Sequence, residues 1–493
     1  MSSTAPVILF NRDPGFTLLT AGVSLLFVFI LGKIIAELRN PLNRIPGPWY
    51  ARFTDWVLLV YTLRGEQLYY LQDLARKYGP VARASPKSVV LGDPNDIRDV
   101  VTDGRAFGKS EWYQDRGGFN GLINTRDLKA HGALRRLFAR GFSNSEIRKL
   151  EALVRGRVTL AMRQMRDESA EHGHADVLKW FSFMATDVIS ELCFGESMHM
   201  LEKGKKDEYI TTLQNGLLTT FLQYDLTPLY WLLKLVPGSV ANRSNNERFS
   251  SFQIYRVERL REKLRSAEGD LTATFFKDIL LQEKQAGLND HEVIGLANEL
   301  IFTGSDTTSN TLSWLVWAVL KNPSARRKLC DEVAKLPHDY SISALEELPY
   351  LNAVLDETLR LYGSVSGDLP RQVWKPEGHT FHNGVFVPHG TNLEVQSHNM
   401  HCSSTVFPNP EKFNPDRWLN ATPQMRACFT PFGGGVRICL GIHLAMIEIR
   451  LVIAEFFRAY PNAEVADLTK DDDMRRRNFT VNVPKGGAVY VKL

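Results

Sequence analysis

One cysteine, placed where a glycine-rich loop meets an apolar helix, constrains this chain more than any other feature. Residues 431–441 read PFGGGVRICLG, and Cys439 lies near the end of this loop. Leu440, Leu444 and Ile447 then recur at helical spacing, so a helix is predicted to begin just after the cysteine. The first backbone N–H groups of such a helix point back toward the sulfur and favour its thiolate form.

The residues around Cys439 suit a flat ligand that carries negative charge. Glycines such as Gly435 and Gly441 let the backbone turn tightly and approach a flat molecule, because they lack a side chain. Phe432 can pack beside the sulfur, and the charge of Arg437 suits a carboxylate. These features predict a socket for a haem whose iron is held by one cysteinate. An ordinary buried cysteine and a dinucleotide loop are the alternatives, although these glycines lack the G-x-G-x-x-G spacing.

The same residues form a family signature. Phe432, Gly435, Arg437, Cys439 and Gly441 fill the pattern Phe-x-x-Gly-x-Arg-x-Cys-x-Gly, which resembles the haem-ligand signature of cytochromes P450. The resemblance implies a mainly α fold with a small β region, the triangular prism of that family. It also implies that the cofactor is haem b (iron protoporphyrin IX), with Cys439 as the axial ligand of the iron and the other four residues around it.

Further basic residues resemble the family's partners for the haem propionates. His131 and Arg135 are one helical turn apart, which places a ring and a guanidinium on one face. The usual eukaryotic pair is Trp-x-x-x-Arg, so His131 is a departure that resembles a bacterial and fungal variant. A solvated basic face that includes Arg136 and Arg140 is the alternative. Arg371, which begins a predicted strand, resembles the third propionate partner.

A long helix with a polar middle is predicted from Asn289 to Leu320. Asn289 and Glu292 form a capping-box pattern at its start. Residues 304–310 are all small or polar, and such a break in an otherwise apolar helix is where function is expected. Cleaving dioxygen needs protons in a site that otherwise excludes water, and a hydroxyl fed by a carboxylate can deliver them.

The polar middle resembles the oxygen-activation motif of cytochromes P450. Residues 303–308 read TGSDTT, and the resemblance gives Thr307 the role of the hydroxyl and Asp306 that of the proton-delivering acid. Thr303 departs from the usual small residue, and we expect its bulk to narrow the pocket. The other residues expected to face substrate are Trp112, Tyr113, Phe302, Val365 and Leu369.

A charged pair on a later helix resembles the structural network of the family. Glu357 and Arg360 lie at i and i+3 on a helix that starts with Pro349. An isolated pair of this kind is usually a surface ion pair of little energetic value. It matches the family's Glu-x-x-Arg, however, and Arg417 resembles the arginine that joins this pair. We therefore expect a buried network that locks the loop carrying Cys439.

The N-terminal segment is long and apolar enough to span a bilayer. Residues 16–31 carry no charge, and the apolar character continues to residue 36. A cleaved signal peptide is the main alternative, but no small-x-small cleavage site follows. Basic residues after the segment favour a cytosolic body, and we expect single-pass insertion in the endoplasmic reticulum membrane. The expected parts are a lumenal N-terminus 1–15, a transmembrane anchor 16–38, a basic and proline-rich hinge 39–49, and a catalytic domain 50–493. The anchor is expected to add membrane affinity and not core packing, so removal of residues 1–44 should leave haem binding intact.

Two further segments are expected to be loops. Residues 107–125, rich in glycine and aromatic residues, should cover the cofactor after a pair of short strands near residues 81 and 88. Residues 229–235 are strongly apolar, and either contact with membrane lipid or core burial would explain them. A polar helix is expected to follow from about residue 242.

Composition excludes several other classes of protein. The 493 residues include 59 Lys and Arg against 55 Asp and Glu, and a net charge of only +4 argues against a nucleic-acid-binding protein. The five cysteines are odd in number and lack C-x-x-C spacing, which argues against a disulfide framework and a zinc site.

These features indicate a haem-thiolate monooxygenase that inserts one atom of O₂ into a small apolar organic substrate. The sequence resembles fungal P450s of secondary metabolism and aromatic-acid hydroxylation, as in residues 359–363. Electrons are expected from NADPH-cytochrome P450 reductase, with cytochrome b5 as a further candidate, docking on basic residues between 135 and 149. The alternatives are a haem-thiolate isomerase or dehydratase, which uses no external electrons, and a non-catalytic haem sensor. Neither needs Asp306 and Thr307, whose presence favours the monooxygenase.

Overall fold

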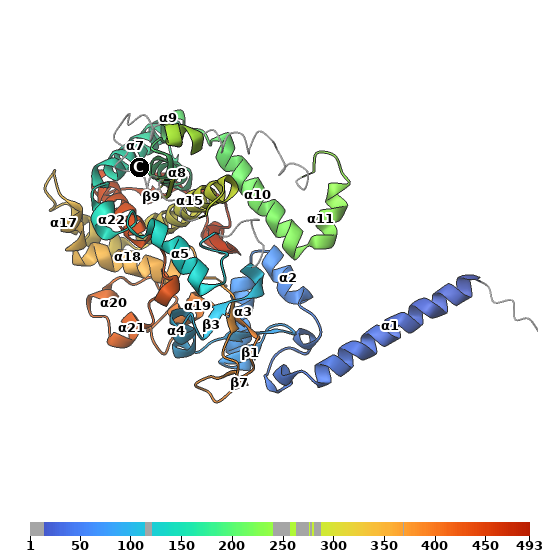
Figure 1. The fold of residues 1–493 in the computed structure, drawn as a ribbon. Helices are drawn as coiled ribbons and strands as arrows, with labels where there is room; N and C mark the ends of the chain where they lie inside the picture. The colour runs from blue at the N-terminus through green and yellow to red at the C-terminus, as the bar shows by residue number, and fades with distance from the viewer. Residues whose placement is uncertain are drawn as a thin grey trace, which may run out of the picture.

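The computed structural model describes residues 14–113, 121–239, 257–262, 276, 279–280, 287–367 and 369–493. Helices dominate these residues, and the strands form four small sheets, so the predicted mainly α fold with a small β region is confirmed (Figure 1).

The N-terminal helix α1 (Pro14–Leu38) projects away from the body of the protein (Figure 1). Its residues Leu18–Leu38 form a candidate span with a hydropathy of 2.3, and the described part of the chain buries none of the apolar window that defines it. Length and composition therefore suit a membrane anchor, and a signal sequence passes the same test.

The last turn of α1 is joined to the body by a buried ion pair. Arg83 donates from its two terminal nitrogens to the two carboxylate oxygens of Glu37, at 2.6 and 3.0 Å. Both side chains are buried, at 1% and 8% exposure. Leu42 and Ile45, which follow α1, pack into a hydrophobic core. The expectation that residues 1–44 add nothing to the core is therefore wrong.

The largest sheet joins strands that are far apart in the sequence. It consists of β1 (Val81–Arg83), β2 (Ser88–Leu91), β8 (Asn392–Glu394), β5 (Arg371–Val373) and β3 (Phe107–Lys109), in that order. Only β2 and β8 run parallel within it. The strands predicted near residues 81 and 88 are confirmed. The pairing of β3 with β5 sets Lys109 directly opposite Arg371.

Helix α15 (Asp290–Leu320) crosses the centre of the molecule, with α7 (Glu151–His172), α8 (Val177–Phe194), α18 (Pro349–Tyr362) and α22 (Ile442–Ala459) around it (Figure 1). The capping box at Asn289 and Glu292 is present, as predicted. A Cβ atom at Gly304 would lie 2.8 Å from Cγ1 of Ile189, so glycine here permits α15 and α8 to pack closely. Most of α15 is buried, which explains its apolar composition.

Two predicted loops contain regular structure. Residues 107–109 form β3, and Glu111–Tyr113 form a short 3₁₀ helix. The apolar segment 229–235 lies mostly in α11 (Thr227–Lys234), which follows α10 (Glu208–Asp225). Trp231 and Leu232 of α11 are 59% and 61% exposed, so this apolar surface is not core. The polar helix expected from residue 242 begins outside the described residues.

The other α-helices that the structure describes are α2 (Trp56–Leu63), α3 (Gln67–Tyr78), α4 (Pro94–Thr102), α5 (Leu128–Ala139), α6 (Asn144–Arg148), α9 (Met200–Lys203), α16 (Pro323–Val333), α17 (Ile342–Glu346), α19 (Ser397–His401), α20 (Asp416–Leu419) and α21 (Pro423–Ala427). The remaining strands are β4 (Ala175–Asp176), β6 (His379–Thr380), β7 (Phe386–Val387), β9 (Glu464–Val465), β10 (Arg476–Phe479), β11 (Val481–Pro484) and β12 (Tyr490–Lys492).

Candidate active site

The loop that carries Cys439 is closed by its own backbone. The amide of Cys439 donates to the carbonyl of Phe432 at 2.9 Å, and a 3₁₀ turn (Gly435–Arg437) lies between them. Helix α22 begins at Ile442, so the predicted helix starts two residues later than Leu440. Cys439 is accessible to solvent. The loop therefore presents its thiol at the start of an apolar helix.

The surroundings of Cys439 act on its charge in opposite directions. Burial of the thiol on its protein side raises its pKa, whereas a hydrogen bond from the Gly441 backbone and the positive charge of Arg135 lower the pKa. The hydrogen bond from Gly441, at the start of α22, thus favours the thiolate as expected, although burial acts against it. Coordination to a metal ion removes the proton from a thiol outright, because the ion is the largest local charge.

Two glycines of the loop, Gly435 and Gly441, differ in what a side chain at their position would meet. Gly435 has φ of +56°, and a Cβ atom there would lie 2.0 Å from the carbonyl oxygen of Thr102. Glycine at this position thus lets the loop pack on the end of α4. At Gly441, by contrast, none of the described residues would have an atom within 4 Å of a Cβ atom. That side of the loop has room for a ligand.

Several basic side chains converge beside this loop. Arg437 donates to the carbonyl oxygens of Thr125 and Arg126 at 2.8 and 2.7 Å. Arg135, on α5, donates to the carbonyl of Ile438 at 2.7 Å, and His131 is buried one turn before it. From the sheet, Arg371 and its strand partner Lys109 are both buried. We call His131, Arg135, Arg371, Arg437 and Lys109 the cationic cluster.

Burial, and then mutual repulsion, lowers the pKa values of three members of the cationic cluster. Burial, followed by the charges of Arg437 and Arg371, lowers the pKa of Lys109 to about 6. Burial, followed by Arg437 and Lys109, lowers the pKa of His131 to about 4. The pKa of Arg437 falls to about 10 through burial and the charge of Arg371. An anionic ligand beside these buried groups would favour their positively charged forms, because an opposite charge offsets both the burial and the repulsion. The two propionates of haem b would supply two such charges, so the residues present fit that cofactor.

Lys109 is the member of this cluster that the sequence did not reveal. Its local sequence, FGKS, has no distinctive pattern. Its role becomes visible only through the pairing of β3 with β5, which sets it opposite Arg371. Lys109 could have been found only by predicting that residues 107–109 pair with residues 371–373 in one sheet.

Threonines line one face of the polar middle of α15. Thr303, Thr307 and Thr311 each donate a hydroxyl proton to the carbonyl four residues earlier, at 2.7, 2.6 and 2.9 Å. Thr308 instead lies against α22, where its hydroxyl is 3.3 Å from a carboxylate oxygen of Glu448. Burial raises the pKa of Glu448 to about 8. The two adjacent threonines, Thr307 and Thr308, therefore have different neighbours.

Asp306 connects the middle of α15 to the protein surface. Burial raises the pKa of its carboxyl, and the positive charge of Lys206 and a hydrogen bond with Gln214 lower it. Lys206 is exposed. The carboxyl thus has a polar neighbour that reaches solvent.

The residues expected to face substrate do not share one environment. Phe302 and Thr303 are half-buried on α15, and Val365 and Leu369 are half-buried on the segment before β5. Tyr113 is buried, and its hydroxyl accepts a hydrogen bond from Arg371 at 3.3 Å. The ring of Trp112 packs edge-on against that of Tyr113, at 4.9 Å between ring centres. Tyr113 therefore lies beside the cationic cluster.

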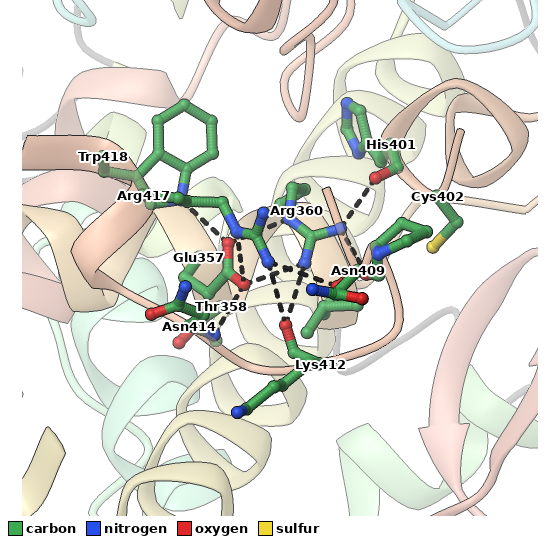
Figure 2. A network of polar contacts seen from close by, with 12 residues as sticks. Glu357, Thr358, Arg360, His401, Cys402, Asn409, Lys412, Asn414, Arg417 and Trp418 are labelled. Atoms are coloured by element: carbon green, nitrogen blue, oxygen red, sulfur yellow. Dashed lines mark hydrogen bonds and ion pairs between the residues drawn. The ribbon is translucent and has the colours of Figure 1, made fainter. Parts of the chain in front are cut away.

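Figure 2 shows the network around Glu357 and Arg360, both of which are fully buried. Arg360 donates two hydrogen bonds of 2.8 Å to the Glu357 carboxylate. Arg417 donates to the same carboxylate at 3.1 Å, and Trp418 donates from its indole at 2.9 Å. Arg360 also donates to the carbonyl of His401 at 2.7 Å. Since the ring of His401 accepts from the amide of residue 430, the network reaches the start of the cysteine loop.

The fold and the site define a class of protein: a helical protein with one exposed cysteine beside a largely buried cationic cluster, an arrangement that suits a flat, dianionic cofactor. The comparisons agree. Residues 46–489 match the family model of cytochrome P450. The chain is 34% identical to cytochrome P450 monooxygenase aflV of Aspergillus parasiticus, over 94% of each chain. It is 35% identical to cytochrome P450 monooxygenase tazI of Aspergillus terreus, over 94% of this chain and 96% of the relative.

The chain belongs to the cytochrome P450 family. It is a monooxygenase of that family, and its cofactor is haem b. A third relative, cytochrome P450 monooxygenase stcB of Emericella nidulans, is 32% identical over 90% of this chain and 87% of its own.

Proposed function

We propose that this enzyme hydroxylates a small apolar organic molecule in a secondary-metabolite pathway, with electrons from NADPH through a separate reductase. The reaction R–H + O₂ + NADPH + H⁺ → R–OH + H₂O + NADP⁺ balances atoms and electrons. The observation that supports it best is the accessible Cys439 beside the cationic cluster, together with Asp306 and Thr307 on α15. Fungal relatives named as monooxygenases support the reaction class.

In this proposal the Cys439 thiolate would hold the haem iron, and the cationic cluster would bind the propionates. Bound haem with a thiolate ligand supplies the activation of O₂. Phe432 and Gly435 shape the loop around the thiolate, and Gly441 leaves room beside it. The network of Glu357, Arg360 and Arg417 holds the loop in place.

Asp306 and Thr307 would move protons toward the reacting oxygen. Thr307 donates its own proton to the Thr303 carbonyl, which leaves its lone pairs to accept a hydrogen bond, and the hydroxyl would turn away from that carbonyl to donate. Burial raises the pKa of the Asp306 carboxyl, and the exposed Lys206 is its neighbour. Asp306 can therefore take protons from solvent and pass them inward. An isomerase or a haem sensor has no use for such a pair.

Exposed basic residues support the proposed redox partners. Arg136, Arg140 and Lys149 are exposed and would offer a basic surface to an acidic reductase, or to cytochrome b5. Arg135 is engaged with Ile438 and contributes less to that surface. We place the enzyme in the endoplasmic reticulum membrane, with α1 as a single-pass anchor and the exposed apolar residues of α11 as a second contact with lipid.

The proton relay can be tested with three variants and one substrate. The substrate is the compound, from a panel of apolar aromatic molecules, that gives the largest low-spin to high-spin shift of the haem. With reductase and NADPH present, Thr307→Ala should raise hydrogen peroxide per NADPH at the expense of product, while the CO spectrum stays intact. Asp306→Asn should slow NADPH consumption. Thr308→Ala is the matched control, because its hydroxyl contacts Glu448. Unchanged coupling in Thr307→Ala would refute the assignment, as would a larger loss at Thr308.

A further inference from the structure

The turn of α15 that carries Thr307 is joined to the segment before β5 by a single serine. The hydroxyl of Ser364 donates to the carbonyl oxygen of Thr307 at 2.7 Å. The hydroxyl of Thr311 donates to the same carbonyl at 2.9 Å and lies 2.8 Å from the Ser364 hydroxyl. These three oxygen atoms form a closed triangle, and Ser364 and Thr311 are each only 4% exposed.

A second serine of the same segment faces a different element. Ser366, 2% exposed, accepts a hydrogen bond of 2.8 Å from the side chain of Asn482 on β11. Asn482 also donates to the carbonyl of Gly363, and it accepts from Asn478 on β10 at 2.9 Å. The segment thus lies between α15 on one side and the β10–β11 hairpin on the other. Val365, one of the expected substrate-facing residues, lies between the two serines.

We propose that Ser364 is a positioning residue that fixes the Thr307 turn of α15, and thereby sets how efficiently electrons are coupled to product. This inference rests on the proposed role of Thr307. The Thr307 side chain belongs to a row of threonines in which each hydroxyl is bound to the carbonyl one turn earlier. Such bonds bend a helix locally, so the position of each carbonyl affects the hydroxyl of its own residue.

Ser364 adds a constraint that α15 cannot supply for itself. It binds the Thr307 carbonyl from outside the helix, and it is buried, so bulk water does not readily replace it. Ser364→Ala would leave the triangle with Thr311 alone. The turn would then be free to shift, and the Thr307 hydroxyl would spend less time where it can deliver a proton. Substrate binding and haem retention need not change.

The test compares two buried serines two residues apart. With reductase, NADPH and the panel compound chosen above, Ser364→Ala should raise peroxide per NADPH about fivefold, the ratio that loss of one hydrogen bond of typical strength produces. Ser366→Ala, which loses a contact to the hairpin and none to α15, should leave this ratio unchanged. The dissociation constant of the panel compound, measured from the spin-state shift, and the CO spectrum should be unchanged in Ser364→Ala, because a merely structural defect would alter them.

A third variant tests the triangle itself. Thr311→Val removes the other hydroxyl while keeping the shape of the side chain. If both hydroxyls act on the Thr307 carbonyl, the rise in peroxide per NADPH in the double variant should be less than the sum of the two single effects. This variant also carries the test if Ser364→Ala does not retain haem. Unchanged coupling in both single variants, or equal uncoupling in Ser364→Ala and Ser366→Ala, would overturn the proposal. If Thr307→Ala itself remains coupled, the proposed proton relay fails. If Thr307→Ala uncouples and Ser364→Ala does not, only the role of Ser364 fails.

Discussion

Glu299 and Lys109 hold the same two residues of a loop from opposite directions. Glu299, on α15, accepts hydrogen bonds from the amides of Leu122 and Ile123. Lys109, on β3, donates to the carbonyl oxygens of the same two residues. The next residues of this loop give their carbonyls to Arg437. Three charged side chains thus fix the loop that borders the cationic cluster. The charges of Arg437 and Glu299 also act in opposite directions on the pKa of Lys109.

The pKa of Lys109 makes a pH-dependent prediction. In the cofactor-free protein this pKa is about 6, well below the ordinary value of 10.5, so between pH 6 and 10.5 the unfolded chain binds more protons than the folded one. Stability of the cofactor-free protein should therefore rise with pH in this window, by at most about 1.4 kcal/mol per pH unit. Urea unfolding between pH 7 and 9 measures it. Lys109→Met should flatten the dependence, whereas Lys129→Met, an exposed lysine, should not. A steep dependence that persists in Lys109→Met would contradict this assignment.

Cys439 provides the most direct test at this scale. Cys439→Ala should abolish the absorbance band that the reduced, CO-treated protein shares with its family, because that band depends on a thiolate ligand. Cys428→Ala is the control, since that cysteine is buried elsewhere in the core. Survival of the band in Cys439→Ala would show that another group binds the iron.

At the scale of elements, the sequence predicted the helices and strands whose formation depends on interactions between neighbouring residues. The capping box at Asn289 and the apolar spacing after Cys439 correctly indicated α15 and α22, because caps and amphipathic spacing act within one or two turns. The strands β1 and β2 were predicted from the alternation of their residues. Thr307 and Asp306 were placed on one helix for the same reason.

What the sequence did not indicate depends on contacts between distant segments. Lys109 is recognised only once β3 pairs with β5, more than 260 residues later in the chain. The segment 229–235 was predicted as a loop, but Pro228 lies in the first turn of α11, where proline favours a helix. The binding of Ser364 to Thr307 likewise requires that α15 pack beside the segment that follows α18.

The network of Figure 2 joins α18 to the segment after α19, and its stability can be measured. Glu357→Gln would remove the negative charge that the fully buried Arg360 faces. We expect a loss of about 3–5 kcal/mol, the cost of leaving a buried charge unpaired. Thermal unfolding and the haem content of the purified protein would measure this loss. Glu411→Gln, which breaks the exposed pair with Arg76, should cost no more than about 1 kcal/mol. Equal melting temperatures in the two variants would show that the network is not structural.

At the scale of the whole molecule, the end of α1, the proposed anchor helix, packs as part of the body. Glu37 lies in the last turn of α1, yet its carboxylate is buried against Arg83 of β1. Asn40 donates to the carbonyl of Pro86 at 3.1 Å, and Leu42 is buried in the core formed with the large sheet. Packing therefore begins near residue 37, within the segment that the sequence assigned to the anchor. A fixed junction of this kind sets the angle between α1 and the body.

This junction predicts that two truncations differ in stability. Removal of residues 1–35 keeps Glu37 and Leu42, so the body should fold, bind haem and leave the membrane fraction. Removal of residues 1–44 leaves Arg83 buried without its partner and removes the Leu42 side chain from the core. That form should be less stable by about 3–5 kcal/mol for the unpaired charge, with about 1.5–3 kcal/mol more for the leucine.

Thermal unfolding of both truncated proteins, with haem bound, measures the difference. Glu37→Gln in the full-length protein is the matched variant, because it removes the charge of Glu37 and keeps the chain. It should reproduce most of the charge-dependent loss, since Arg83 is 1% exposed and water cannot solvate it. Equal stability of the two truncations would show that the Glu37–Arg83 pair does not join α1 to the body. If the protein lacking residues 1–35 instead stays with the membrane after a high-salt wash, the exposed apolar residues of α11, Trp231 and Leu232 among them, form a second contact with lipid.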